Sequence, residues 1–277
     1  MNALNALLLP LIGFVVAVPS SIIGLGGGFL IVPILILIFQ LPPQNAVAIS
    51  LVAISGTTIS ATIAYAKQGR IDYVLGLLYD VLDLPGVAIG AYLTTLLPSN
   101  LLTGIVGFFI AFISIILMVR KESDSPLTKQ EAANIRSKVW RRIKTDSSGK
   151  SFEYIVRRPH LALFSSFVGG IVTGLAGLGG GITDTATMIL LGVPPHIAVA
   201  TSEFAMALTN GTGVIAHGLL NNILIDYAIL TTVGTIIGAQ VGSLLAKHIR
   251  ARTLKILLCS VAFLVGIRMI LLALMSL

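Results

Sequence analysis

Charged residues are scarce in this chain. Only 10% of its 277 residues are Asp, Glu, Lys or Arg, whereas soluble proteins carry roughly 25%. Apolar residues make up 56% of the chain and form long runs at 101–119, 224–246 and 256–277, which approach the ~20 residues that cross a bilayer. The short alternating segments of a membrane β-barrel are missing. The sequence therefore predicts an all-α polytopic protein of the cell membrane.

Motifs of several other protein classes are also missing. Cys259 is the single cysteine, so no intrachain disulfide or cysteine metal cluster is expected, and we interpret it as a small apolar side chain within a helix. No Lys or Arg precedes the first apolar run, which argues against a cleaved signal peptide. Neither a His-Glu-x-x-His zinc motif nor a nucleotide-binding P-loop occurs. We expect no metal, no cofactor, no nucleic-acid partner and no ATP-driven pumping.

The chain contains an internal repeat, which begins with a glycine-rich stretch. Gly24-Leu-Gly-Gly-Gly28 recurs at 177–181, each time inside an apolar segment too long for one span. Three later stretches also match between the halves: 41–50 with 193–202, 71–73 with 225–227, and 86–90 with 234–238. The other apolar segments are 45–66, 73–97 and 101–119, then 195–219, 224–246 and 252–276. The repeat predicts two membrane halves, 1–119 and 160–277, joined by a basic loop at 120–159.

The basic residues decide between two topologies. If each Gly-broken segment crossed the membrane once, the basic loop 247–255 would lie opposite the 120–159 loop. If each is a re-entrant hairpin followed by three spans, the halves are inverted and 17 of the 18 Lys and Arg residues face the cytoplasm. Because positive charge is enriched on that side, we expect the inverted arrangement, with both termini outside. Within the loop, residues 128–144 form either a helix on the membrane surface or a solvated basic linker.

The two glycine-rich tips are the predicted substrate site. In lipid, a broken helix is tolerated where it is buried in protein or lines a cavity. The helix that starts at each tip directs free N–H groups and a positive dipole end to the centre, which favours an anion without any arginine. Close helix packing is the alternative role of such glycines. The predicted anion-binding residues are Gly26, Gly27, Gly28, Ser50, Thr57, Gly179, Gly180, Gly181, Thr183, Ser202 and Asn210.

Ionisable residues inside apolar segments are costly and are therefore functional candidates. The predicted proton carriers are Glu203, Asp184, Asp80 and Asp83. Asp80 and Asp83 share a helix face, where two close carboxylates resist ionising together; alternatively, one of them neutralises Arg268. Polar residues at segment ends are expected to be helix caps (Asp72, Asp226) or interfacial side chains (His196, His217).

These motifs resemble those of the TauE/SafE sulfite exporter family of membrane permeases. The resemblance rests on the paired Gly-x-Gly-Gly-Gly segments, the Pro-Pro-x-x-Ala-Val-Ala-x-Ser stretches and the later Gly-x-x-x-Gly segments, and it covers both halves without the central loop. It implies a small sulfur-containing anion as substrate, such as sulfite, sulfoacetate or another organosulfonate. Asp80 and Asp83 are not part of the family pattern, so they could mark a different substrate or coupling ion.

The leading hypothesis is a secondary transporter, not an enzyme, that moves a small anion by alternating access between the two tips. A passive anion channel is an alternative that the sequence does not separate from a carrier. An intramembrane aspartyl protease is a second alternative, because Tyr79-Asp80 matches half of that active site. Its other half, Gly-x-Gly-Asp, is replaced by Gly177-Leu-Gly-Gly180. Membrane lipids are expected partners, and the sequence leaves a homodimer open.

Overall fold

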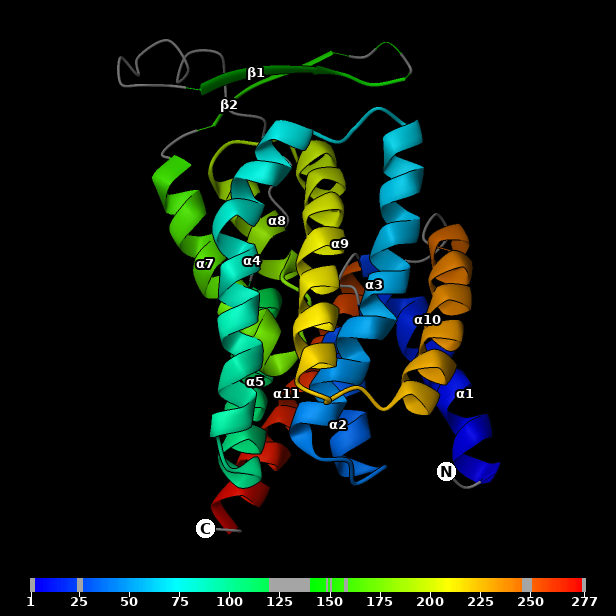
Figure 1. Ribbon diagram of the computed structural model, residues 1–277. Coiled ribbons are helices and arrows are strands. Elements are labelled where there is room, and N and C mark those ends of the chain that lie inside the picture. The colour runs from blue at the N-terminus through cyan, green and yellow to red at the C-terminus, as the bar shows by residue number, and fades with distance from the viewer. Residues whose placement is uncertain are drawn as a thin grey trace.

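The protein is a helical bundle with one pair of strands lying across one end (Figure 1). The computed structural model describes residues 3–23, 27–119, 140–147, 149, 151–156, 159–245 and 251–275. The first half contains α1 (Ala3–Ile23), α2 (Gly28–Leu37), α3 (Pro43–Lys67), α4 (Tyr73–Leu96) and α5 (Ser99–Val119). The strands β1 (Trp140–Thr145) and β2 (Ser151–Val156) follow, and then α7 (Pro159–Ala176), α8 (Gly181–Leu190), α9 (Pro195–Leu219), α10 (Ile225–Leu245) and α11 (Ala251–Met275).

Five helices of the described chain are long and apolar enough to cross a membrane, namely α3, α4, α5, α10 and α11. Helix α9 is as long as α3, at 25 residues, but it is not among these five, and it carries Ser202, Glu203, Thr209 and Asn210. Helices α1, α2 and α7 contain shorter apolar stretches. The chain is therefore a multi-pass membrane protein, and α9 contributes several of the buried polar side chains of the bundle.

Each glycine-rich stretch separates a long helix from a helix of 10 residues. At the second stretch, α7 and α8 are antiparallel, because the Thr173 hydroxyl meets Gly180 and the Ser165 hydroxyl lies 2.8 Å from that of Thr187. At the first stretch, Gly27 faces Ser20 of α1. The backbone reverses through positive φ angles, 86° at Gly27 and 46° at Gly180, which cost other residues about 1–2 kcal/mol each.

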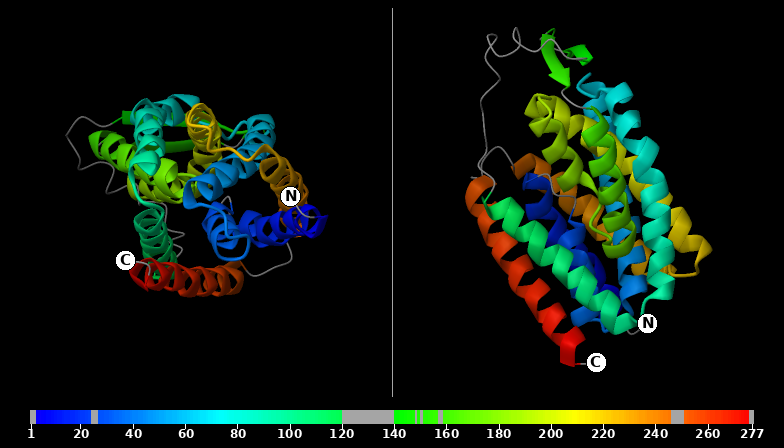
Figure 2. Two further views of the ribbon diagram at one scale, coloured as in Figure 1. Left: turned by 60° about the horizontal axis from the view of Figure 1, so that its bottom comes forward. Right: turned by 90° about the vertical axis from the view of Figure 1, so that its left-hand side faces the viewer.

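The main contacts between helices have counterparts between the equivalent helices of the other half. Helix α1 packs on α10, and its equivalent α7 packs on α4. Helix α3 packs on its own equivalent α9, and α5 on its equivalent α11, along one edge of the bundle (Figure 2). Likewise, α2 packs on α3, and α8 on α9. The repeat in the sequence is thus accompanied by a matching pattern of contacts.

The two strands lie at one end of the bundle, and both termini lie at the other (Figure 1). They form an antiparallel hairpin in which Trp140 pairs with Val156 and Thr145 with Ser151. The surface helix considered for 128–144 is therefore wrong for 140–144, and 128–139 lie outside the described residues. Side chains of β1 alternate between half-buried and exposed, which is the period of a strand. The all-α expectation missed this hairpin.

Asp72, the residue just before α4, binds the strand hairpin to the helical bundle. Asp72 caps α4 as predicted, accepting a hydrogen bond from the Leu75 N–H at 3.2 Å. Its carboxylate also accepts from Arg142 Nε at 2.9 Å and from the Tyr154 hydroxyl, while its own N–H donates to Thr201 Oγ1 at 3.0 Å. Burial by itself raises the pKa of Asp72, but the hydrogen bonds and the Arg142 charge outweigh it and hold this pKa below its usual value. The hairpin is thereby tied to both α4 and α9.

Candidate functional site

The two glycine-rich tips meet in the interior of the bundle. A Cβ atom placed on Gly28, the first residue of α2, would lie 2.5 Å from the Gly177 carbonyl oxygen, which is closer than such atoms can approach. The same carbonyl accepts a hydrogen bond from the Ser50 hydroxyl of α3 at 2.9 Å. Val47 of α3 also lies against Gly177. The absence of a side chain at Gly28 therefore lets the two tips touch.

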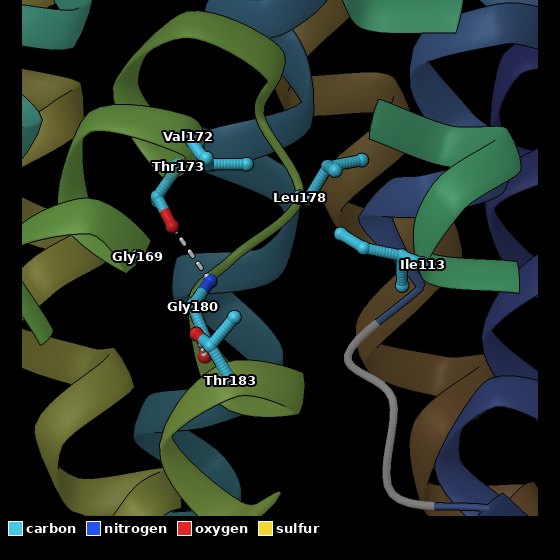
Figure 3. Close-up of a pocket in the computed structure, with 7 residues that line it drawn as sticks. All are labelled: Ile113, Gly169, Val172, Thr173, Leu178, Gly180 and Thr183. Carbon is cyan, nitrogen blue, oxygen red and sulfur yellow. Dashed lines mark hydrogen bonds between the residues drawn. The ribbon is translucent and has the colours of Figure 1, made fainter. Parts of the chain in front are cut away.

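The second tip surrounds a small opening, drawn in Figure 3. Thr173 Oγ1 accepts a hydrogen bond from the Gly180 N–H at 2.7 Å, so the Thr173 hydroxyl hydrogen can still be donated to another acceptor. Thr183 donates its hydroxyl to the Gly180 carbonyl at 2.6 Å. The opening between these groups, Leu178 and Ile113 has a volume of about 10 Å³, which is room for one water molecule.

The donors expected to be free at the second tip are used locally in this conformation. The Gly180 N–H is taken by Thr173, and that of Gly181 points to the Gly179 carbonyl. The N–H groups of Thr183 and Asp184 reach the Gly180 carbonyl at 3.0 and 3.1 Å. An anion at this tip must therefore replace such local partners.

Three carboxyl groups gather beside the second tip. Asp80 and Asp83 come from α4 and Asp184 from the first turn of α8, and all three are at most 2% exposed. A Cβ atom placed on Gly180 would lie 3.5 Å from Asp184 Oδ2 and 3.9 Å from Asp83 Oδ2. Thr209 of α9 joins Asp80 to Asp83. Four elements, α4, α7, α8 and α9, therefore bring acids and hydroxyls to one buried place.

The Thr209 hydroxyl lies between two carboxyl groups of this cluster. Its oxygen lies 3.2 Å from Asp80 Oδ1 and is also hydrogen-bonded to Asp83 Oδ2. A hydroxyl carries one hydrogen and donates it to a single acceptor. The other contact is a hydrogen bond only when that carboxyl group is protonated and donates to Thr209. The geometry therefore suits a pair of carboxyl groups that hold one proton between them.

Several polar atoms around this cluster have no hydrogen-bond partner within the described ranges. They are the Tyr79 hydroxyl, Asp80 Oδ2, Asp83 Oδ1, both Asp184 carboxyl oxygens and the Asn210 amide. Each unpaired buried group costs about 1–3 kcal/mol, so the cluster is suited to take up protons or a polar ligand. Among the residues that the structure places, no three His, Cys, Asp or Glu side chains are arranged to hold a metal ion.

A larger cavity of about 280 Å³ lies between α1, α3, α9 and α10. Its polar lining consists of hydroxyls, amides and one carboxyl group, including Ser20, Thr57, Ser60, Tyr65, Glu203 and Gln240. At its inner end, Ser20 faces the first tip, with its Cβ atom 3.6 Å from the Cβ position of Gly27. The cavity therefore leads to the glycines of the first half.

The predicted anion-site residues fall into separate groups. The Asn210 amide lies beside Gly179, with Oδ1 3.6 Å from its Cβ position, and the Ser202 hydroxyl lies 3.4 Å from the Gly181 carbonyl oxygen. Thr57 lies apart from them, in the cavity that also holds Glu203. Gly26 lies outside the described residues.

The sequence analysis did not single out three hydroxyl residues that lie at these sites: Ser20 in the larger cavity, Thr173 at the second tip and Thr209 in the carboxyl cluster. A comparison of the halves contains the signal that could have found them. Ser20 and Thr173 each precede a glycine-rich stretch by the same interval, and Thr209 is the equivalent of Thr57.

Two structural expectations were wrong. His217 is fully buried rather than interfacial, because its ring nitrogens find partners at the Gly174 carbonyl (3.0 Å) and the Asn222 amide (3.1 Å). Asp226 lies within the first turn of α10 rather than before it.

Arg268 does not neutralise the aspartates of α4. It is exposed on α11, and the ion pairs that join described residues are Asp72–Arg142 and Arg141–Glu153. Among the described side chains, Thr209 is the hydrogen-bond partner of both carboxyl groups of α4.

Comparison with known proteins gives the family. The family described as "Sulfite exporter TauE/SafE" matches residues 9–269. A probable membrane transporter protein of Bacillus subtilis strain 168, YunE, is 32% identical over 96% of this chain and 98% of its own length. Sulfite exporter TauE/SafE family protein 3 of Arabidopsis thaliana is 24% identical over 93% of this chain and 76% of its own. No solved structure gives a significant match.

The resemblance inferred from the glycine-rich motifs is thus confirmed over nearly the whole chain. The family and its relatives are described as membrane transporters, in agreement with the apolar helices of the bundle. The chain belongs to the sulfite exporter TauE/SafE family of membrane transporters.

Proposed function

We propose that the protein is a secondary transporter of a small anion in the cell membrane, working by alternating access between its two glycine-rich tips. One observation carries the proposal: the two glycine-rich stretches touch at Gly28 and Gly177 inside a bundle of apolar helices. Broken helices that meet at the centre of a repeated membrane fold are the typical place of a substrate site.

The packing pattern supports an inverted repeat. The contact of α1 with α10 has its counterpart in the contact of α7 with α4, because α7 is equivalent to α1 and α4 to α10. In this proposal each half, 1–119 and 160–277, contributes a re-entrant hairpin and three spans, with the 120–159 loop in the cytoplasm. Lys67, Arg70 and the 247–255 segment then face the cytoplasm, in agreement with the enrichment of positive charge there.

The anion binds at the tips through backbone N–H groups and hydroxyls. At the second tip the donors are the N–H of Gly180 and the hydroxyls of Thr173 and Thr183, which already converge on one opening. Helix α8 starts there, so its positive dipole end adds to the attraction. The opening holds about one water molecule in this conformation, so a sulfonate enters only when it widens.

Protons accompany the anion in this proposal. An anion at Gly180 lies beside the carboxyl groups of Asp83 and Asp184, and like charges at this distance repel strongly in a low-dielectric interior. Protonation of the acids removes the repulsion, so uptake of protons and uptake of the anion favour each other. The contacts of Thr209 with Asp80 and Asp83 support one shared proton in the same cluster.

The substrate class follows from the family. Sulfite and small organosulfonates such as sulfoacetate are the proposed anions, because the family is described as sulfite exporters. The transporter names of the relatives also favour transport over intramembrane proteolysis.

Counterflow in proteoliposomes tests the proposal. Vesicles that contain the purified protein and are loaded with unlabelled sulfoacetate are placed in a trace of labelled sulfoacetate. A carrier accumulates label transiently above the equilibrium level because internal substrate drives exchange. A passive channel shows no such overshoot. Protein-dependent flux of sulfoacetate, sulfite and isethionate that never exceeds that of chloride would refute the sulfonate assignment.

A further inference from the structure

The two halves differ in how they pack: the space beside α3 is open, and residues of the equivalent space beside α9 are buried. The open space is the cavity of about 280 Å³ between α1, α3, α9 and α10. It extends along α3 from Thr57 to Gln68, roughly 16 Å at 1.5 Å per residue. The Gln68 carbonyl accepts a hydrogen bond from the N–H of Ser147 in the strand hairpin, at 3.0 Å. The outer end of the cavity therefore lies at the strand end of the bundle.

Helices α3 and α9 can be compared residue by residue. Both follow a Pro-Pro pair and both have 25 residues, so Pro43 corresponds to Pro195. With this alignment, Thr57 corresponds to Thr209 and Tyr65 to His217. Glu203, the one carboxyl group of the cavity lining, corresponds to Leu51.

The residues that correspond to the cavity lining, two on α9 and one on α3, are packed rather than open to a cavity. His217 is fully buried, and its Nε2 lies 3.0 Å from the Gly174 carbonyl oxygen of α7. Leu51 is also fully buried, and its Cδ1 lies 2.9 Å from the Cβ position of Gly213. Thr209 is occupied by the aspartates of α4.

We infer that the cavity is the substrate pathway from the strand end to the tips, and that the packed region around Leu51, Gly174 and His217 is the closed pathway on the opposite side. The inference rests on the proposed transport function and adds its route. Because the two regions are built from equivalent elements, the protein can exchange them. In the other state, the α4–α7 pair separates from α9, and the α1–α10 pair closes on α3.

The route assigns two different roles to equivalent residues. Ser20, Ser60 and Tyr65 line the open route and contact a passing anion in the present state. His217, whose ring joins α9 to α7, holds the second route shut through its hydrogen bond to Gly174. Breaking this bond is then a step of the conformational change.

Paired cysteine variants test the route. In a Cys259→Ala background, Thr57→Cys and Thr209→Cys each place a thiol at equivalent positions with little change in size. A membrane-impermeant methanethiosulfonate reagent is applied to vesicles with either face outward. Without substrate, we expect Thr57→Cys to react from the strand side at least about tenfold faster than Thr209→Cys reacts from either side, because buried thiols react only after local opening. Ala64→Cys, at the outer part of the cavity, is a second reporter that should also react from the strand side.

The same variants separate this inference from the proposed substrate. Equal rates for Thr57→Cys and Thr209→Cys, or reaction of Thr57→Cys only from the side opposite the strands, would overturn the route. Addition of sulfoacetate should slow labelling of Thr57→Cys and speed that of Thr209→Cys. The expected labelling without any effect of sulfoacetate would support the route and count against the sulfonate assignment. Sulfoacetate transport by a protein whose Thr57→Cys thiol is unreactive from both sides would refute the route and leave the transport function intact.

Discussion

Substitution of Gly28 by alanine probes the contact between the two tips. The added methyl carbon would clash with Ile54 Cδ1, the end of a flexible side chain that can move aside. It would also lie 2.5 Å from the Gly177 carbonyl oxygen, which belongs to the backbone, and 3.1 Å from Ser50 Oγ. Ordinary contacts of this kind need about 3.5 Å, so the tips must separate by roughly 1 Å. Overpacking of this kind costs about 1–3 kcal/mol, and loss of the hydrogen bond from Ser50 to Gly177 costs about 1 kcal/mol more. The expected loss of stability is therefore about 2–4 kcal/mol.

Thermal unfolding of the detergent-purified protein measures this loss. At roughly 2–4 °C per kcal/mol for a chain of this size, Gly28→Ala should lower the melting temperature by about 5–15 °C. Ser50→Ala removes the hydrogen bond alone and should lower it by about 2–4 °C. Gly211→Ala is the control, because nothing lies within 4 Å of its Cβ position; alanine in this helix should leave the melting temperature unchanged or raise it slightly. A melting temperature of Gly28→Ala equal to that of Gly211→Ala would refute the contact between the tips.

Three further substitutions, one of them with a matched control variant, test separate parts of the account. Gly180→Leu should insert normally and lose transport, because its backbone has a φ of 46° and its side chain would fill the space between Thr173 and the carboxyl groups; near-normal uptake by correctly inserted protein would contradict the backbone site. Glu203→Gln should weaken the pH dependence of transport, and an unchanged pH profile would remove Glu203 as a proton carrier. Arg142→Ala should release the strand hairpin at a cost of about 2 kcal/mol, whereas Arg141→Ala, whose ion pair is exposed, should cost less than about 0.5 kcal/mol. Trp140, the only tryptophan, reports release of the strand hairpin by a red shift of its fluorescence. Identical shifts for the two variants would contradict the claim that the Arg142–Asp72 ion pair holds the hairpin in place.

The ion pair between Arg142 and Asp72 also predicts how pH acts on the strand hairpin. The pKa of Asp72 is lower in the folded protein than in the unfolded chain, so its contribution to stability is complete above the unfolded value of about 3.9. The contribution is lost only as pH falls through the folded value. The Trp140 fluorescence should therefore stay constant between pH 8 and about pH 5. A transition of the parental protein near neutral pH would show that another group controls docking.

The membrane fold and the family could be predicted from the sequence, because both are carried by local patterns. Long apolar runs, glycine-rich stretches and Pro-Pro pairs are visible without any contact information. The cap at Asp72 was predicted for the same reason. The strand hairpin was missed because its alternation is short and its strongest tie, from Arg142 to Asp72, joins residues far apart in the chain.

The carboxyl cluster shows what the sequence could not supply. That Asp80 and Asp83 share a helix face was predicted from their spacing. Thr209 of α9 and Asp184 of α8 reach these aspartates only through the packing of four elements, which no local sequence pattern predicts. The alternative that one aspartate pairs with Arg268 is wrong for the same reason: the order of segments does not reveal that α11 packs on α5 rather than on α4.

Ligand-dependent thermal stability tests the central claim, anion binding at the tips, most directly. A ligand present at about 100 times its Kd stabilises the folded state by about 2.7 kcal/mol, or roughly 5–10 °C. Sulfoacetate, isethionate and sulfite should raise the melting temperature of the parental protein, whereas acetate and malonate should not. Gly180→Leu should abolish the shift. Stabilisation by the carboxylates alone, or an equal shift in the Gly180→Leu variant, would contradict a sulfonate site built on these glycines.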